Sequence, residues 1–105
     1  MDINKLAKNL GLEEDEYLEL IALLIQTSTA DIGRIESAIK EQDPDEAAAA
    51  LHSIKGAAGN LGLMDIYELA RQGESDARNN ALDKIPDIVH AIKTRLNSLA
   101  ELAGH

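Results

Sequence analysis

The sequence has no cysteine, no phenylalanine and no tryptophan, and its aromatic side chains are two tyrosines. Without cysteine the chain can form no disulfide scaffold and no cysteine-ligated zinc finger, and it lacks a thiol nucleophile. Basic residues are also few, with 10 Lys and Arg against 19 Asp and Glu and a net charge of −9. Because phosphate backbones and anionic lipids attract Lys and Arg, we expect neither a nucleic-acid partner nor a membrane partner.

Long apolar runs are missing as well. No stretch of the sequence approaches the roughly 18 apolar residues of a membrane-spanning helix, and the first residues lack the apolar region of a signal peptide. We therefore expect a cytoplasmic protein. A length of 105 residues suits one domain, residues 1–105, with one modest core, and we expect a monomer.

What the chain does contain is Leu, Ile and Ala at helical spacing. This pattern predicts an all-α protein with helices over about 3–9, 13–42, 43–61 and 63–79 and from residue 83 onward. Asp43 can cap the third of these helices, with Glu46 completing a capping box. Short connections favour an antiparallel four-helix bundle with a short additional N-terminal helix.

Residues 47–64 differ from the rest of this acidic chain, because Lys55 is their only formal charge and none of them is acidic. The same segment contains Gly56 and Gly59 inside a predicted helix. An interior helical glycine costs about 1 kcal/mol relative to alanine. Two such glycines therefore indicate either close packing against a neighbouring helix or room for an approaching ligand or partner.

One face of this helix surrounds a histidine with small residues and one cation. Residues three and four positions apart share a helix face, and the face of His52 carries Ala48, Ala49, Lys55, Gly56 and Gly59. Neutral imidazole is a nucleophile at cellular pH, since its reference pKa is about 6.5. An incoming phosphoryl group needs a nearby cation and few carboxylates. The face therefore indicates a phosphoryl acceptor, the alternative being an ordinary surface histidine.

The segment from His52 to Gly62, HSIKGAAGNLG, resembles the signature of histidine-containing phosphotransfer (HPt) domains, His-x-(Leu/Ile)-Lys-Gly followed by small residues and a later glycine. The resemblance extends over essentially the whole chain. It implies a four-helix bundle that carries a phosphoryl group between receiver domains of response regulators, downstream of a (hybrid) sensor histidine kinase. It also implies a phosphocarrier rather than an enzyme, with no cofactor or metal of its own and with magnesium in the partner receiver.

The resemblance further implies individual roles. His52 would be phosphorylated on Nε2, Lys55 would contact the phosphoryl oxygens, and Gly56 would leave room beside the ring. Glu74, at the position of a family Gln or Glu, would hydrogen-bond the other ring nitrogen, and Arg78 would add positive charge. The alternatives are an edge carboxylate that reaches solvent and an ordinary solvated arginine.

Two further features bear on this assignment. Gly73 departs from the family pattern, which more often has a larger apolar residue before the acid, and an alignment shift of one turn there would displace Glu74. His90 and His105 have weaker claims to a role, since His90 lies off the apolar stripe and His105 is terminal.

A receiver domain would need an apolar docking patch near the histidine. A second apolar stripe on the long helix is our candidate, together with the small residues of the histidine face: Leu18, Ala22, Ile25, Ala48, Ala49 and Gly59. The alternative is that the short first helix covers the stripe.

Three other functions compete. A histidine-kinase dimerisation domain usually has an acid after its histidine, where this chain has Ser53, and it would need a Gly-rich nucleotide motif elsewhere. An acyl carrier needs an Asp-Ser-Leu-type site at a helix start, whereas Ser75 lies mid-helix. A structural bundle without phosphotransfer predicts that His52→Gln has no effect.

Overall fold

The computed structural model describes residues 2–103, and every regular element in that range is helical. The elements are α1 (Ile3–Asn9), α2 (Glu14–Lys40), α3 (Pro44–Asn60), α4 (Met64–Arg78), a short 3₁₀ turn η1 (Leu82–Lys84) and α5 (Ile85–Leu102). The all-α prediction is confirmed, and the predicted helix ends agree to within a few residues. Within residues 2–103, no helix is both long and apolar enough to cross a membrane. His105 lies outside the described residues.

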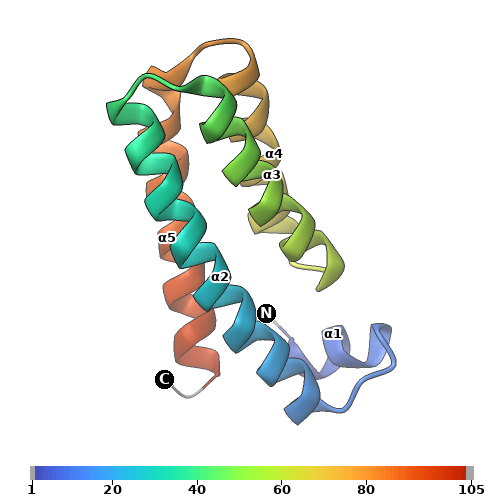
Figure 1. Cartoon of the computed structure of the whole chain (residues 1–105). Coiled ribbons are helices and arrows are strands. Elements are labelled where there is room, and N and C mark those ends of the chain that lie inside the picture. Colours follow the sequence, from blue (N-terminus) through green and yellow to red (C-terminus); the bar gives the residue numbers. More distant parts are fainter. Residues whose placement is uncertain (1, 104–105) are drawn as a thin grey trace.

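The four longer helices run in alternating directions along the molecule, and α1 lies beside the N-terminal end of α2 (Figure 1). Helix α3 packs against both α2 and α4, and α5 packs against α4 and α2. Helix α3 therefore has a neighbour on two flanks. Its remaining face, which includes Ala49, His52, Ser53 and Gly56, is exposed.

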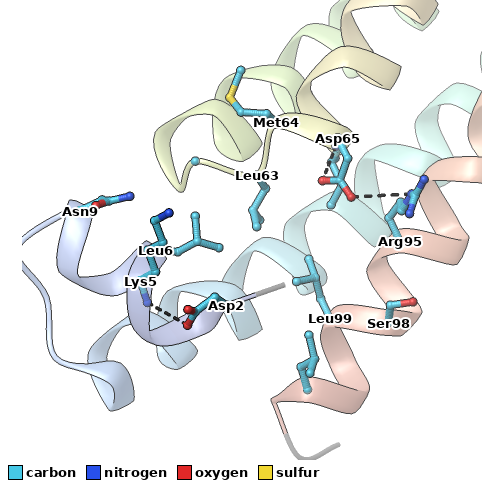
Figure 2. A pocket seen from close by; sticks show the side chains of 13 residues that line it. Asp2, Lys5, Leu6, Asn9, Leu63, Met64, Asp65, Arg95, Ser98 and Leu99 are labelled. Carbon is cyan, nitrogen blue, oxygen red and sulfur yellow. Dashed lines mark hydrogen bonds and ion pairs between the residues drawn. The ribbon is translucent and has the colours of Figure 1, made fainter.

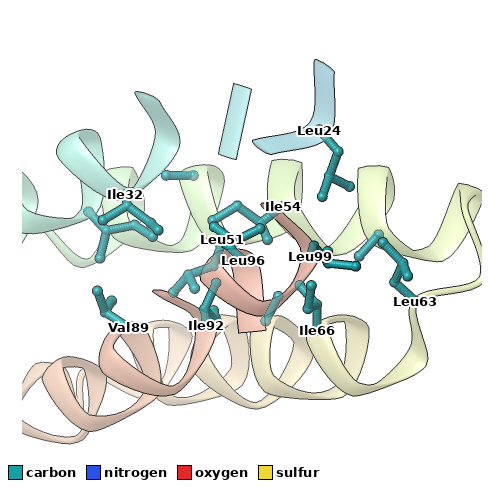
Figure 3. Packing of buried hydrophobic residues seen from close by; sticks show 14 of the residues in the cluster. Leu24, Ile32, Leu51, Ile54, Leu63, Ile66, Val89, Ile92, Leu96 and Leu99 are labelled. Carbon is teal, nitrogen blue, oxygen red and sulfur yellow. The ribbon is translucent and has the colours of Figure 1, made fainter. Parts of the chain in front are cut away.

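Aliphatic side chains from all four longer helices meet in the core (Figure 3). Leu51 and Ile54 of α3 are completely buried there, as is Ile92 of α5. Each fully buried side chain of this size stabilises the fold by roughly 1.5–3 kcal/mol. This burial fixes the rotation of α3 about its own axis. The residues on the side of the helix away from Leu51 and Ile54 must then face outward.

The two ends of α3 are held in different ways. At its start, the Asp43 side chain accepts a hydrogen bond from the backbone N–H of Glu46 at 3.1 Å, as predicted for an N-cap. The predicted capping box is wrong, because the Glu46 carboxylate pairs with Arg34 of α2 instead. At its end, the buried hydroxyl of Tyr17 donates to the carbonyl of Leu61 at 2.5 Å, and burial raises the pKa of that hydroxyl.

Candidate functional site

His52 stands on the open face of α3, with 63% of its side chain exposed. The two interior glycines beside it serve different purposes. A Cβ atom at Gly56 would meet nothing within 4 Å, so this glycine leaves open space on the exposed face. A Cβ atom at Gly59 would lie 3.2 Å from Cδ2 of Tyr67, so that glycine allows α4 to pack closely. Close packing therefore explains Gly59, whereas Gly56 lies beside open space.

Glu74 of α4 lies directly beside the histidine. Its Oε2 atom is 3.1 Å from Nδ1 of His52, while its Oε1 atom is 2.7 Å from Nζ of Lys55. Arg78, one turn further along α4, reaches Oε2 with Nη2 at 2.8 Å and Nε at 3.2 Å. The structure thus brings Lys55, Glu74 and Arg78 together beside His52, and Glu74 lies at the other ring nitrogen, where the resemblance placed it.

The carboxyl group of Glu74 is ionised at physiological pH. Its side chain is only 9% exposed, and burial alone would raise its pKa. The hydrogen bonds and positive charges of Lys55 and Arg78, together with His52, outweigh burial and lower the pKa from 4.5 to about 2. A buried carboxylate is tolerated here because four N–H donors from three side chains surround its two oxygens.

An ionised carboxylate can only accept hydrogen bonds, so the Nδ1 atom of His52 is the nitrogen that carries the ring proton. In the neutral ring, the Nε2 atom then has a free electron pair. A phosphoryl acceptor needs such a nitrogen atom as its nucleophile. Lys55 is 23% exposed and Arg78 is 60% exposed, so both cations lie at the surface around an accessible nucleophile.

Gly73 explains how α4 comes close enough for this contact. It is buried, and a Cβ atom there would lie 3.0 Å from Cδ2 of Leu51 and 3.3 Å from Cγ2 of Ile88. The space that a larger apolar residue would take in the family pattern is therefore filled by Leu51 of α3. The departure at Gly73 leaves Glu74 in place.

One of the predicted docking residues needs a correction. Ala48 is only 1% exposed, because the flank of α3 that contains it is covered by α4, so it cannot contact a partner. Ala49, in contrast, is exposed. Leu18, Ala22 and Ile25 are partly buried on the flank of α2 that faces away from α3.

Other apolar residues of α2 border α3 instead. A hollow of about 230 Å³ lies between the two helices, and Leu20 and Leu23, which are 39% and 54% exposed, form its α2 side with Leu24 and Thr27. Ala57, Asn60 and Leu61 form its α3 side. The sequence analysis missed this set. The signal in the sequence that could have found this set is the pair Leu20 and Leu23, which lie off the main apolar stripe of α2.

A larger hollow, of about 620 Å³, lies elsewhere, between α1, the start of α4 and α5 (Figure 2). Its lining contains no histidine. Figure 2 shows Asp65 directed toward Arg95, 3.7 Å away, so the charges there are partly paired. In the part of the chain that the structure describes, no group of three or more His, Cys, Asp or Glu side chains is placed to hold a metal ion.

Comparison with known families agrees with this geometry. Residues 19–102 match the family model of the Hpt domain, and the chain belongs to that family. Hpt domains are helical phosphocarrier modules of two-component phosphorelays, in which they interact with receiver domains and histidine kinases. Helix α1 lies outside the matched residues. Searches of curated proteins and of solved structures found no match.

Proposed function

We propose that this Hpt domain carries phosphoryl groups on Nε2 of His52 between receiver-domain aspartates in a multistep phosphorelay. The observation that carries the proposal is the exposed ring of His52, bound through Nδ1 to the ionised Glu74 at 3.1 Å. This contact leaves Nε2 as the nucleophile, and the open space at Gly56 lets a partner approach it.

In the proposed step, the Nε2 electron pair attacks the phosphorus of a receiver aspartyl phosphate. A bond from Nε2 to phosphorus forms, the bond from phosphorus to the aspartate oxygen breaks, and that electron pair stays on the aspartate carboxylate. Lys55 and Arg78 supply positive charge beside the phosphoryl oxygens. Magnesium is expected in the acidic site of the receiver, and the reverse reaction passes the group to the next receiver.

The receiver is proposed to dock on the hollow between α2 and α3, beside the open face of α3. Leu20 and Leu23 offer exposed apolar surface there, and Ala57 lies next in the chain to Gly56. A receiver seated on this flank would contact α3 on the side opposite α4. The Glu74 contacts would then stay undisturbed.

The direct test is transfer of ³²P from a phosphorylated receiver domain to the purified chain. We expect an acid-labile, alkali-stable label, as befits phosphohistidine, and its complete loss in His52→Gln. His90→Gln is the matched control, since His90 is also an exposed histidine on a helix. Labelling of His52→Gln at the wild-type level would show that the assignment is wrong.

The docking surface is tested separately. Leu23→Glu should slow transfer at low receiver concentration and recover as the receiver concentration rises, because it weakens the encounter rather than the chemistry. Leu102→Glu is the control, since Leu102 is similarly exposed, at 51% against 54%, but lies at the end of α5. Equal effects of the two substitutions would rule out this docking surface.

A further inference from the structure

The hollow on which the receiver is proposed to dock lies between α2 and α3, and a hydrogen bond joins these two helices at one end of it. The hydroxyl of Tyr17, on α2, donates to the carbonyl of Leu61, the residue that ends α3. Leu61 itself lines the α3 side of the hollow, and Leu20, which lines the α2 side, lies one turn after Tyr17. The bond therefore fixes one side of the hollow to the other.

The backbone at the end of α3 leaves the Leu61 carbonyl for a side chain to satisfy. The amides of Leu61 and Leu63 both donate to the carbonyl of Ala58, and Gly62 turns the chain with a φ of 75°. Within residues 2–103, no backbone amide of the turns and loops donates to the Leu61 carbonyl. Because a buried carbonyl without a partner is costly, the turn stays where the Tyr17 hydroxyl holds it.

Tyr17 can hold the turn in one place because the core fixes its ring. The side chain is completely buried, as is that of Ile21 one turn further along α2. Close packing leaves such a ring little freedom to shift. The position of the hydroxyl, and with it the position of Leu61, is therefore set by the core of the bundle rather than by contacts at the surface.

Helix α1 contacts the same turn. A Cβ atom at Gly62 would lie 3.5 Å from Cδ2 of Leu6, so this side chain of α1 packs against the turn. Leu6 and Tyr17 both precede residues 19–102, which match the family model. The contacts that place the end of α3 thus come from a part of the chain that the family match does not include.

We infer that Tyr17 is a positioning residue for docking of the receiver: through the carbonyl of Leu61 it fixes the end of α3 against α2 and so sets the shape of the apolar hollow. The inference rests on the proposed function, because it concerns the partner of the same site. It gives Tyr17 no part in the chemistry at His52, which lies more than two helical turns before Leu61 on α3.

Tyr17→Phe tests the hydroxyl apart from the ring, because it retains the buried aromatic side chain and removes the donor. Rates of ³²P transfer to the chain are measured over a range of concentrations of a phosphorylated receiver. We expect the concentration that gives the half-maximal rate to rise by roughly two- to tenfold, the range that corresponds to the loss of one hydrogen bond. The maximal rate should stay unchanged, since His52 and its contacts are untouched.

Tyr67→Phe is the matched control, because it removes the hydroxyl of the other tyrosine in the chain. The ring of Tyr67 lies against Gly59 from α4, not from α2. Both kinetic constants should be unchanged in this variant. Phosphoramidate, a small phosphoryl donor that needs no docking surface, should label His52 at the same rate in the unsubstituted chain and in both variants.

A second measurement needs no substitution at Tyr17. The chain is prepared with ¹³C-labelled tyrosine, its two ring signals are assigned with Tyr67→Phe, and an unphosphorylated receiver is added. We expect the Tyr17 signal to shift as the receiver binds, although this ring is completely buried and cannot touch the receiver. An unmoved Tyr17 signal at saturating receiver would overturn the inference, whether or not Tyr17→Phe folds.

The kinetic outcomes separate docking from chemistry and from stability. An unchanged half-saturating concentration in folded Tyr17→Phe would overturn the inference and leave Tyr17 with a structural role alone. A fall in the maximal rate or in labelling by phosphoramidate would overturn it as well, because the effect would then lie at His52. Failure of every receiver to exchange phosphoryl groups with His52 would instead contradict the proposed function, and the inference would fall with it.

Discussion

Two ionic clusters join α3 to its neighbours, and their compositions are opposite. In the Glu74 cluster, one buried carboxylate on α4 binds the nitrogen groups of His52, Lys55 and Arg78. In the Arg34 cluster, one guanidinium on α2 binds the carboxylates of Asp31, at 3.0 Å, and Glu46, at 2.5 Å. The Glu46 hydrogen bond is the main reason that the pKa of Arg34 is raised.

The difference lies in the group that the other members share, which is a buried carboxylate in the Glu74 cluster and a half-exposed guanidinium in the Arg34 cluster. Where the acid is buried, the exposed groups are N–H donors, and a phosphoryl group would be attracted. Where the cation is flanked by two carboxylates, a further negative group would be repelled. The chain is acidic overall, yet it presents positive charge at His52 because Glu74 lies beneath the surface.

The largest expected effect distinguishes the two clusters by function. Lys55→Ala should slow phosphoryl transfer by about ten- to a hundredfold, since a hydrogen bond to a charged group contributes roughly 1.5–3 kcal/mol. Arg34→Ala should leave the transfer rate unchanged. Rates of ³²P transfer from a receiver measure both, with far-UV circular dichroism to check the fold. Loss of helix in Lys55→Ala would instead indicate a structural role for the lysine.

Next in size is the effect of filling the space beside Glu74. Gly73→Ala should destabilise the fold by about 1–3 kcal/mol, because its Cβ atom would lie 3.0 Å from Leu51 in a packed core. Urea unfolding measures this change. A neutral or stabilising result would show that Leu51 can move aside and that α4 does not depend on glycine for its close approach.

Acid should weaken the Glu74 cluster over a defined range of pH. The folded-state pKa of Glu74, about 2, lies below its ordinary value of 4.5, so the carboxylate stabilises the fold fully above about pH 4.5. That stabilisation is lost as the pH falls toward 2, by on the order of 2 kcal/mol once solvent screening is allowed for. Urea unfolding of wild type and Glu74→Gln should therefore converge in acid. A constant difference between them would contradict this expectation.

The smallest expected effect is that of Gly33→Ala beside the Arg34 cluster. It should change stability in the opposite direction to Gly73→Ala. A Cβ atom at Gly33, next to Arg34 on the exposed side of α2, would meet nothing within 4 Å. Gly33→Ala should therefore stabilise the fold by about 0.5–1 kcal/mol through helix propensity alone. Urea unfolding of Gly33→Ala and Gly73→Ala under the same conditions gives the comparison. Destabilisation by Gly33→Ala would contradict the expectation that a Cβ atom fits here without a close contact.

The sequence was sufficient to predict the helices and the residues of the Glu74 cluster. Helical spacing and capping residues are local signals, and the family signature ties Lys55 and Gly56 to His52 within a single helix. The position of Glu74 followed from the resemblance, and the contact with Nδ1 of His52 supports it.

The proposed docking surface could not be predicted in the same way, because it depends on how helices pack. A helical projection places Ala48 beside His52, but it does not tell which flank of α3 will be covered by α4. The same limit applies to α2, where the sequence analysis chose Leu18 and did not consider Leu20, which borders α3. Likewise, the carboxylate of Glu46 binds Arg34 instead of completing the capping box. Arg34 lies twelve residues earlier in the chain, and the packing of α2 against α3 brings it close.

The positions of the two tyrosines give this protein an optical property. The hydroxyl of Tyr17 binds the carbonyl of Leu61, and the ring of Tyr67 lies against Gly59, so both rings contact the C-terminal part of the histidine helix. With no tryptophan in the chain, its near-ultraviolet absorption and fluorescence arise from these two rings. If a receiver with neither tryptophan nor tyrosine binds beside Leu61 and changes the surroundings of these rings, intrinsic fluorescence would thus report the binding without an attached dye.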